Sequence, residues 1–562
     1  MEKISIDDSI FKLYAEIKPK MVKLFFEISY NRGIDHGTIQ HSIMLFDKYV
    51  TSKMIDEKKL EVAIIICLLI ADKIRGCHKI NLKNILEFFE GEYTKENLFE
   101  LEIEILNSIR YDLYFKSLSD CFDQYGRNKM VYSEYHFCLL LSYILLMFGY
   151  SHIIIEELAN KIINFVNIFS TDEDIMKKRI LNDPFNSFLF MEWFKMEDND
   201  TESKVFFKYF EMSNFLNIQR KISAQRIFNE ILGEIQNKKL DMWYSITANK
   251  HTSLSVHIYS AKSLYDKVVV KELGSGTFGL VRSVFISGKK IALKKVMSNH
   301  YDDYGIQSEI IREISSLIVL KHPNIVKIKG HICIKDITYI GMELMECDLY
   351  TRIVKDTDKI GKNTKFSYIA QLLKGIVYMH NKNIMHRDLS FKNILISGNV
   401  LKIGDLGSSK YLLNGCNNEN KYSEYVCTVG FRAIELLLGK LTYNEKIDIW
   451  SCACLIGFIL GRKILFSGDN KKTVLNSIFS VLGTPMNDFN PDIHKWLQFN
   501  SKLSAVSAVN TVYHRTGFVF LERKYQKLVD ILYKMFEYSP TKRISAEKAL
   551  VEFEENFSSL KN

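Results

Sequence analysis

The octapeptide His386-Arg387-Asp388-Leu389-Ser390-Phe391-Lys392-Asn393 is followed by the tetrapeptide Gly404-Asp405-Leu406-Gly407. An amide at Asn393 stands five residues after the carboxylate of Asp388, and a second carboxylate follows at Asp405. Phosphoryl transfer requires a base that receives the proton of a hydroxyl group, together with oxygen ligands for magnesium ions that bridge the phosphates. We therefore expect Asp388 to act as the base and Asn393 and Asp405 to bind Mg²⁺.

A glycine-rich segment, Gly274-Ser275-Gly276-Thr277-Phe278-Gly279-Leu280-Val281, lies upstream of these loops. Glycine has no side chain that would keep the backbone away from phosphate groups, so such a segment is suited to covering a nucleotide. Ile291-Ala292-Leu293-Lys294 follows where the next strand is expected, and Glu313 lies on a later amphipathic helix. We expect Lys294 to bind the phosphates of ATP and Glu313 to form an ion pair with it.

Residues 265–556 resemble the cyclin-dependent kinases, within the larger group that includes the mitogen-activated and glycogen synthase kinases. Gln307-Ser308-Glu309-Ile310-Ile311-Arg312-Glu313 is similar to the PSTAIRE helix of that family. The resemblance implies an α+β bilobal protein kinase fold, with ATP and Mg²⁺ as cofactors. Four further motifs stand where the family has them: His322-Pro323-Asn324-Ile325-Val326, Asp448-Ile449-Trp450-Ser451, Leu482-Gly483-Thr484-Pro485 and Ser539-Pro540-Thr541-Lys542-Arg543-Ile544-Ser545-Ala546.

The resemblance also implies a set of active-site residues. The expected catalytic residues are Asp388, Lys294, Glu313 and Lys392, and the expected metal ligands are Asn393 and Asp405. The expected ATP-binding residues are Leu273, Gly274, Gly276, Thr277, Phe278, Gly279, Val281, Ala292, Lys294, Glu343, Met345, Asp348 and Leu395, with Met342 as the gatekeeper.

Three positions depart from the family pattern. Ser390 replaces the Lys that touches the transferred phosphate in Ser/Thr kinases, although Lys392 stands where tyrosine kinases place a basic residue. Leu406 replaces the Phe of the D-F-G motif, and Ile434 replaces the Pro of the A-P-E motif. Two alternatives to an active Ser/Thr kinase therefore stay open: a cyclin-like scaffold with an inactive kinase domain, and a tyrosine or dual-specificity kinase.

The activation segment implied by the resemblance runs from Asp405 to Glu435. Ser423 aligns with the activating Thr of cyclin-dependent kinases, and Ser423-Glu424-Tyr425 is similar to the T-E-Y lip of mitogen-activated kinases. We therefore treat Ser423 and Tyr425 as phosphorylation sites. A phosphate would add nearly two negative charges, and the basic residues expected to receive it are Arg312, Arg387 and Lys410.

The glycine-rich loop carries one regulatory difference from the family. Thr277 keeps the outer inhibitory phosphorylation site, but Phe278 replaces the neighbouring Tyr and has no hydroxyl group. We therefore expect that the tyrosine phosphorylation which inhibits cell-cycle kinases does not act on this chain.

Two later positions bear on substrates and on the fold. Arg432 is present where this kinase group favours Pro after the target residue, so the resemblance implies protein substrates with Ser-Pro or Thr-Pro sites. Glu435 and Arg543 are both present, and the resemblance implies an ion pair between them.

Residues 1–240 carry long helical periodicity and no kinase motif, and they resemble a cyclin. Asp47-Lys48-Tyr49-Val50, the apolar run from Leu60 to Lys73, and the stretch from Tyr93 to Leu113 follow the order of a cyclin box. The resemblance implies an all-α domain, with a first cyclin box at about 17–115 and a second helical repeat at about 117–235. It also implies that Lys73 and Glu102 contact a PSTAIRE helix, within this chain or in another.

Residues 241–264 form a polar predicted linker. Fully extended, such a stretch reaches roughly 80 Å, and as a flexible coil it averages roughly 25 to 30 Å. A tether of this kind gives an effective concentration on the order of millimolar. We therefore expect a kinase that carries its own cyclin-like activator.

The composition agrees with folded domains in a reducing compartment. The ten Cys form no C-x-x-C pair, and the close pair Cys452 and Cys454 falls in an apolar stretch that predicts a core helix. The apolar stretch from Phe137 to Ile155 contains Ser, Tyr and His, so we expect a core helix there and no membrane partner.

The charge pattern bears on partners and on location. The net charge of +9 includes no basic run, so we expect no nucleic acid partner. We expect an intracellular protein of the cytoplasm or nucleus. Abundant Ile, Asn and Lys suggest an AT-rich genome, such as that of a virus or parasite.

Overall fold

The computed structural model divides into two compact units. Unit 1 comprises Met1–Ser255 with the short segments Asp303–Gly305 and Leu413–Asn417, and unit 2 comprises Val256–Asp302, Ile306–Leu412 and Asn418–Asn562. The structure describes residues 21–22, 25, 33–52, 59–76, 80–89, 91–126, 138–139, 141–143, 155–168, 175, 179, 186, 189, 257–258, 268–276, 279–286, 289–297, 305–334, 337–355, 360–412, 428–440, 442–483 and 517–557.

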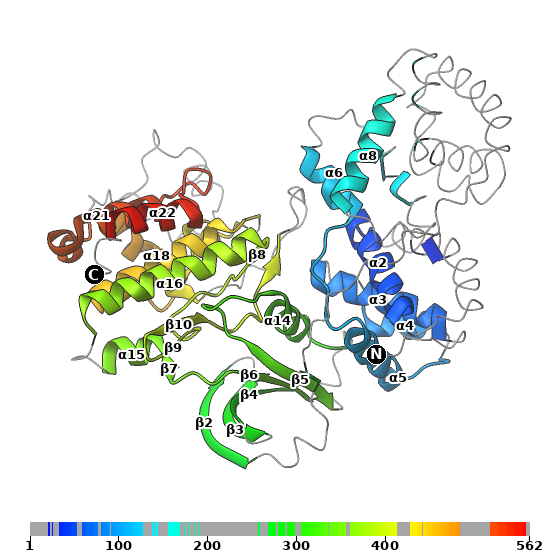
Figure 1. The fold of residues 1–562 in the computed structure, drawn as a ribbon, viewed down its shortest axis with the longest axis horizontal. Coiled ribbons are helices and arrows are strands. Elements are labelled where there is room, and N and C mark those ends of the chain that lie inside the picture. Colours follow the sequence, from blue (N-terminus) through cyan, green and yellow to red (C-terminus); the bar gives the residue numbers. More distant parts are fainter. Residues whose placement is uncertain are drawn as a thin grey trace. The chain divides into compact units, whose positions relative to one another are not determined.

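Helices are the only regular secondary structure among the described residues of unit 1 (Figure 1). Its central helix α3 is almost entirely buried, and it packs against α2 and α5. Helix α3 ends because Gly76 adopts a left-handed φ of 76° and donates its N–H to the carbonyl of Asp72 at 2.8 Å. Its long described helices are α2 (His36–Ser52), α3 (Leu60–Arg75), α4 (Leu82–Phe88), α5 (Lys95–Ser108), α6 (Leu118–Gly126) and α8 (Ile155–Ile168).

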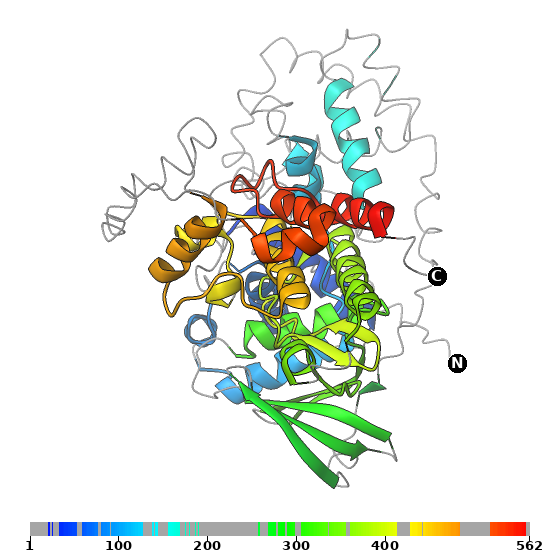
Figure 2. The same ribbon diagram turned by 90° about the vertical axis from the view of Figure 1, so that its left-hand side faces the viewer.

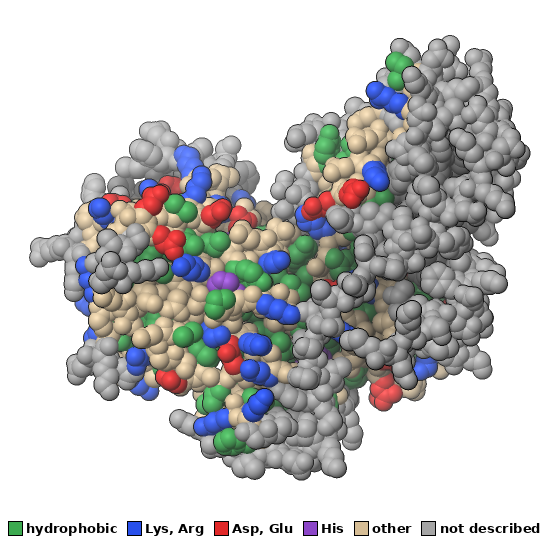
Figure 3. Space-filling view, in the orientation of Figure 1, with side chains coloured by type: hydrophobic (Ala, Val, Ile, Leu, Met, Phe, Trp, Pro, Cys, Tyr) green, Lys and Arg blue, Asp and Glu red, His purple; other side chains and the backbone are tan. Residues whose placement is uncertain are grey.

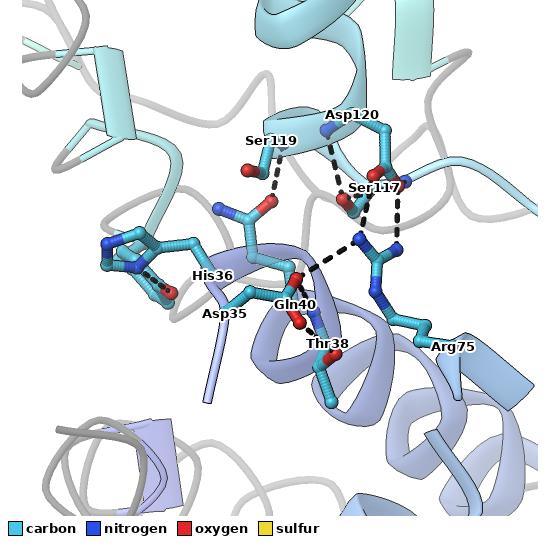
Figure 4. Close-up of polar contacts among 9 residues, drawn as sticks. Asp35, His36, Thr38, Gln40, Arg75, Ser117, Ser119 and Asp120 are labelled. Atoms are coloured by element: carbon cyan, nitrogen blue, oxygen red, sulfur yellow. Dashed lines mark hydrogen bonds and ion pairs between the residues drawn. The ribbon is translucent and has the colours of Figure 1, made fainter. Parts of the chain in front are cut away.

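A buried polar cluster joins three of these helices (Figure 4). Arg75 at the end of α3 forms a bidentate pair with Asp120 of α6, at 3.0 and 3.1 Å, and also contacts Asp35 just before α2, at 3.1 Å. Gln40 of α2 accepts the backbone N–H of Ser119 at 2.8 Å. These bonds hold the start of α6 against α2 and α3. Ion pairing and hydrogen bonding therefore add to the apolar packing between these helices.

The N-terminal lobe of unit 2 is built on a six-stranded sheet with the order β1-β5-β6-β4-β3-β2. Buried Val284, Ile291 and Leu293 form its core cluster, and helix α14 (Ser308–Val319) packs against β5. Figure 2 shows the strong twist of the green strands, as expected for antiparallel ribbons. The strands are β1 (His257–Ile258), β2 (Val268–Gly276), β3 (Gly279–Ile286), β4 (Lys289–Met297), β5 (Ile328–Ile334) and β6 (Ile337–Met342).

The C-terminal lobe of unit 2 is mainly helical. Helix α16 packs against α18 and α22, and α18 packs against α21, so these helices lie side by side in Figures 1 and 2. The helices are α15 (Leu349–Lys355), α16 (Lys362–Asn381), α17 (Ile434–Leu437), α18 (Lys446–Gly461), α19 (Lys471–Leu482), α21 (Val519–Met535) and α22 (Ala546–Phe557), with the short helix η6 (Val429–Phe431).

Short strands at the junction of the two lobes carry the loops of interest. Strands β7 (Cys347–Asp348), β9 (Ile394–Ser397) and β10 (Val400–Ile403) form one sheet, and β8 (Ile384–Met385) pairs with β11 (Lys410–Tyr411). The octapeptide therefore lies between β8 and β9, and the tetrapeptide lies between β10 and β11. Two short antiparallel pairings bring the two loops together.

The predicted fold class, an all-α region followed by an α+β region, is confirmed. The prediction of a core helix around Cys452 and Cys454 is also confirmed, because α18 is buried nearly along its whole length. No described helix has the length and apolarity needed to cross a membrane. Most of the predicted second repeat, much of the predicted linker, and Thr277, Phe278, Ser423 and Tyr425 lie outside the described residues.

The described surface of unit 2 carries charges of both signs (Figure 3). Surface ion pairs include Lys374 with Glu554 at 3.0 Å and Lys534 with Glu552 at 2.8 Å. Pairs of this exposure contribute little to stability. Buried charged side chains are therefore the stronger candidates for a chemical role.

Candidate active site

The carboxylate of Asp388 is held by three hydrogen bonds from two residues. Its Oδ1 accepts the backbone N–H of Thr428 at 2.9 Å and the Thr428 hydroxyl at 3.0 Å. Its Oδ2 accepts the amide of Asn393 at 3.1 Å. A carboxylate oriented from both sides in this way suits a base that must meet a hydroxyl group in one direction.

Asp448 of α18 holds the loop that carries Asp388 through backbone hydrogen bonds. The two oxygens of Asp448 accept the backbone N–H groups of His386 and Arg387, each at 2.9 Å, and one also pairs with His380. Burial alone would raise the pKa of Asp448, but the bonds from His380 and from the backbone hold it below its ordinary value. These bonds stabilise Arg387 in a left-handed conformation with a φ of 68°, which is costly for a side chain of this size.

A buried ion cluster lies next to this loop. The ammonium group of Lys294 on β4 contacts both oxygens of Glu313 on α14 at 2.8 and 2.9 Å, and Oδ1 of Asp405 at 3.2 Å. Burial would lower the pKa of Lys294, but the two carboxylates outweigh it and raise that pKa above its ordinary value. Burial raises the pKa of Glu313, with Lys294 opposing the change. The predicted pair between Lys294 and Glu313 is present.

The two residues expected to bind Mg²⁺, Asn393 and Asp405, lie on loops that a backbone hydrogen bond joins. The backbone carbonyl of Asn393 accepts the N–H of Gly404 at 2.8 Å, which ties the two loops together. The Asn393 amide nitrogen donates to Asp388, at 2.8 Å to the carbonyl and 3.1 Å to the carboxylate, so the amide oxygen faces away from Asp388. An amide oxygen beside a carboxylate is a hard donor set that fits Mg²⁺.

Strand register brings the expected nucleotide-binding residues together. In the six-stranded sheet, Val281 on β3 lies opposite Lys294, and Ala292 on β4 lies opposite Met342 at the end of β6. In the three-stranded sheet, Leu395 on β9 lies opposite Asp348 on β7. Among the remaining expected residues, Gly274 and Gly276 end β2, Gly279 begins β3, and Leu273 is 41% exposed.

Two of the expected nucleotide-binding residues already hold local structure. Asp348 accepts the backbone N–H of Thr351 at 2.7 Å and therefore caps the start of α15. The backbone N–H of Glu343 donates to the carbonyl of Lys327 at 3.0 Å, and the Glu343 carboxylate accepts the Lys327 N–H at 2.7 Å and pairs with Lys402. The backbone leading to Met345 is thereby fixed at the junction of the lobes.

Residues 267–552 match the model of the protein kinase domain. The chain belongs to the protein kinase family. Residues 5–114 match the model of the cyclin N-terminal domain. The protein is thus a protein kinase with a fused cyclin domain, and its kinase domain implies the use of ATP.

Two similar viral proteins align with nearly the whole chain, and a third similar protein aligns with half of it. A mimivirus protein provisionally named serine/threonine-protein kinase L670 is 32% identical over 96% of this chain and 92% of its own length. A second from the same virus of Acanthamoeba polyphaga, L673, is 30% identical over 93% of this chain and 94% of its own. Cell division control protein 2 homolog 3 of Trypanosoma brucei brucei is 35% identical over 50% of this chain and 88% of its own length.

These matches show a serine/threonine-protein kinase class of enzyme. They are also consistent with the viral source that the composition suggested.

In the cyclin domain, Lys73 and Glu102 form an ion pair with each other. Their side chains are 2% and 0% exposed. Burial lowers the pKa of Lys73, and Glu102 and Asp72 oppose this change without cancelling it. The two residues that the family resemblance singles out are therefore a single buried unit on α3 and α5.

The three predicted phosphate-receiving residues of the kinase domain are all nearly buried. Arg387 donates to the carbonyl of Ser408 at 2.7 Å and to the Tyr443 hydroxyl at 3.2 Å. Arg312 contacts Ser308 and Glu309 of its own helix. Lys410 on β11 pairs in register with Met385, two residues before Arg387.

The three departures from the kinase pattern lie in different surroundings. Leu406 is fully buried, so an aliphatic side chain packs where the family has Phe. Ile434 begins α17, and the neighbouring Glu435 forms the predicted pair with Arg543 at 2.8 and 2.9 Å. Ser390 is buried and Lys392 is exposed.

Sequence reasoning assigned no role to Thr428 or Asp448, yet both determine the geometry of the kinase active site. Asp448 was visible as part of a motif, and only the structure shows that it accepts the backbone N–H groups before Asp388. Thr428 lies in the activation segment, where no spacing rule indicated its contact with Asp388.

Proposed function

We propose that this protein is an active, cyclin-dependent-type Ser/Thr kinase that uses ATP and Mg²⁺ and carries its own activator. The observation that supports this most strongly is the assembled cluster of Lys294 with Glu313 and Asp405 beside the oriented carboxylate of Asp388. An inactive scaffold has no need to keep two carboxylates and an ammonium group together at a cost in desolvation.

The chemistry proposed for these residues is in-line transfer. A Ser or Thr hydroxyl of a protein substrate gives its proton to Asp388, and its oxygen forms a bond to the γ-phosphorus as the bond to the β,γ-bridging oxygen breaks. Lys294, positioned by Glu313, binds the phosphates of the nucleotide. Mg²⁺ held by Asn393 and Asp405 would neutralise the charge of the phosphate oxygens.

We further propose that the substrates are proteins with Ser-Pro or Thr-Pro sites. Arg432, the residue that the resemblance links to this preference, is 6% exposed. Ser390 cannot supply the positive charge of the Lys it replaces, and Lys392 is the proposed substitute. We expect the encounter with substrates in the cytoplasm or nucleus.

Labelled phosphate transfer tests the activity. The purified full chain is incubated with ATP, Mg²⁺ and peptides that differ only in Ser-Pro against Ser-Ala, beside an Asp405→Asn variant. Transfer to Ser-Pro by the wild-type chain alone is expected. Transfer to tyrosine peptides would favour a dual-specificity enzyme, and no transfer after phosphorylation of the activation segment would favour a scaffold.

The activator role rests on Lys73 and Glu102 and on the tether. A specific protease site placed in residues 241–256 tests this role. We expect activity that is independent of protein concentration before cleavage and that falls on dilution after cleavage, because the millimolar effective concentration is lost. Unchanged activity on dilution would contradict the proposal.

Regulation through the activation segment is a further part of the proposal. Phosphate on Ser423 or Tyr425 would be received by Arg312, Arg387 and Lys410, and phosphate on Thr277 would inhibit. Mass spectrometry of the active protein, with Ser423→Ala and Tyr425→Phe variants, tests the first point.

A further inference from the structure

Two serine hydroxyl groups join α14 to the start of the activation segment. Ser316 on α14 and Ser409, four residues after Asp405, are both fully buried, and their oxygens lie 2.6 Å apart. Neither side chain belongs to the set of residues that the proposed function uses. A pair of buried hydroxyl groups that meets across two elements is stable only when each proton has an acceptor.

The direction of this hydrogen bond follows from a second contact. The Ser409 hydroxyl donates to the carbonyl of Leu406 at 2.6 Å, and the Ser409 backbone N–H donates to the same carbonyl at 3.0 Å. A hydroxyl group has one proton, so the Ser316 hydroxyl is the donor between the two serines. The result is a relay from Ser316 to Ser409 to the carbonyl of Leu406.

The relay ends at the residue next to Asp405. Asp405 has a left-handed φ of 52°, a conformation that needs support from its surroundings. Ser316 lies three positions after Glu313 on α14, so both lie on the same side of the helix. The helix thus makes two polar contacts with this loop, one through Glu313 and Lys294 to Asp405, and one through the serine pair.

The packing at Gly407 shows how closely the loop lies against α14. A Cβ atom at Gly407 would lie 3.7 Å from the Glu313 carboxylate and 3.8 Å from the carbonyl of Glu309. Small movements of the helix would therefore be felt directly by the loop. A hydrogen bond that fixes the distance between α14 and the loop therefore also affects the geometry of the ion cluster.

We propose that Ser316 and Ser409 form a positioning pair that holds α14 against the metal-binding loop and so keeps Lys294, Glu313 and Asp405 assembled before substrate binds. The inference concerns the same site as the proposed phosphotransfer and rests on it for its effect on rate. The pair touches no reacting atom. We expect the pair to affect the binding of the nucleotide phosphates and the rate of transfer, and to leave the binding of adenine unchanged.

Ser315 provides a matched control in the same helix. Its hydroxyl is also fully buried, but it donates to the carbonyl of Ile311 one turn earlier, at 2.7 Å, within α14 itself. A Ser315→Ala variant therefore removes a buried hydroxyl from α14 without removing the contact to the loop.

The experiment uses the full chain and its Ser316→Ala, Ser409→Ala, double and Ser315→Ala variants. Affinity for ADP with Mg²⁺ and for adenosine is measured by calorimetry, and transfer to a Ser-Pro peptide is measured in parallel. Each single variant is expected to lose about three- to tenfold in ADP affinity and in kcat, the range of one hydrogen bond. Adenosine affinity is expected to stay unchanged, and the double variant is expected to lose little more than either single variant, because the two hydroxyl groups act as one unit.

Several outcomes would overturn the inference. An equal loss of ADP and adenosine affinity would indicate general loosening of the domain, and so would a Ser315→Ala variant that behaves like Ser316→Ala. Additive losses in the double variant would show that the two hydroxyl groups act separately. A Ser316→Cys variant, similar in size but a weak donor, is expected to resemble Ser316→Ala, and wild-type affinity in it would contradict the relay.

The binding measurements separate this inference from the proposed function. If the wild-type chain transfers no phosphate while ADP and adenosine affinities respond as expected, the proposed enzyme activity fails and the positioning pair stands. If transfer occurs but ADP affinity is indifferent to both serines, the positioning pair fails and the enzyme activity stands.

Discussion

Each domain of this protein buries a lysine–glutamate ion pair, and the two pairs differ in what surrounds them. Lys73 and Glu102 in the cyclin domain are almost completely buried. Lys294 and Glu313 in the kinase domain are similarly buried, but Lys294 also contacts Asp405, whose side chain is 29% exposed. The pKa of Lys73 is lowered because burial dominates, whereas the pKa of Lys294 is raised because two carboxylates outweigh burial.

The difference separates a closed pair from an open one. In the cyclin domain the two side chains are almost completely buried and pair with each other, and removing one partner leaves a buried charge. In the kinase domain the cluster carries one carboxylate more than its ammonium group needs, and that carboxylate reaches solvent. An excess of oxygen ligands with access to solvent is what a cation with a phosphate ligand requires.

The largest effect is expected at the open site. An Asp388→Asn variant keeps the size of the side chain but cannot receive a proton, and general-base loss typically costs 10²- to 10⁴-fold in rate. We expect labelled phosphate transfer by the full chain to fall by about 10³-fold, with no change in thermal midpoint. A variant that loses stability as well as activity would show that Asp388 is also needed for folding.

The next effect tests the closed pair. A Glu102→Gln variant leaves the Lys73 ammonium buried without its carboxylate, which we expect to cost about 3 kcal/mol of unfolding free energy. Urea unfolding followed by circular dichroism measures this. The matched Glu313→Gln variant should cost less, because Asp405 still pairs with Lys294. Equal losses in the two variants would refute the distinction between closed and open pairs.

Acid should weaken the cyclin domain through one buried histidine. His41 of α2 is 1% exposed and packs against the Phe115 ring in a tilted arrangement, with a distance of 4.3 Å between ring centroids. Burial first, and then the charges of Arg75 and Lys48, lower its pKa from 6.5 to about 3. The unfolded chain therefore binds a proton that the folded chain refuses, so stability falls as the pH drops below 6.5.

The size of this loss follows from linkage. At pH 5 the folded domain should lose about 2 kcal/mol relative to pH 8. Urea midpoints at the two pH values measure it, and a His41→Phe variant is the control. If that variant keeps the same pH dependence, other groups are responsible.

The smallest predicted effect concerns Lys392. We expect Lys392→Ala to lower kcat by about tenfold, because one exposed charge near the transferred phosphate contributes on the order of 1 kcal/mol. Lys392→Arg should keep most of the rate. If both variants keep full activity, Lys392 does not replace the charge that Ser390 lacks, and the enzyme works without that interaction.

The fold and the main site residues could be read from sequence because they occur in short, specific motifs. The pairing of Lys294 with Glu313 and of Glu435 with Arg543 needed no coordinates to predict. The roles of Thr428, Asp448 and the Ser316–Ser409 pair could not be read, because no motif names the partners that these side chains contact. Single polar residues of this kind have no spacing rule. Their meaning comes from burial, which a sequence pattern does not report.

The short strand β1 has a mechanical consequence. His257 and Ile258 fall within the predicted linker, yet they pair in parallel with Gly330 and His331 at the edge of the six-stranded sheet. The tether between the two domains is therefore fastened ahead of the glycine-rich segment. Because only two residues pair here, this attachment is weak. If it opens, residues 258–268 add up to about 35 Å to the reach of the tether, so the tether has a short form and a long form.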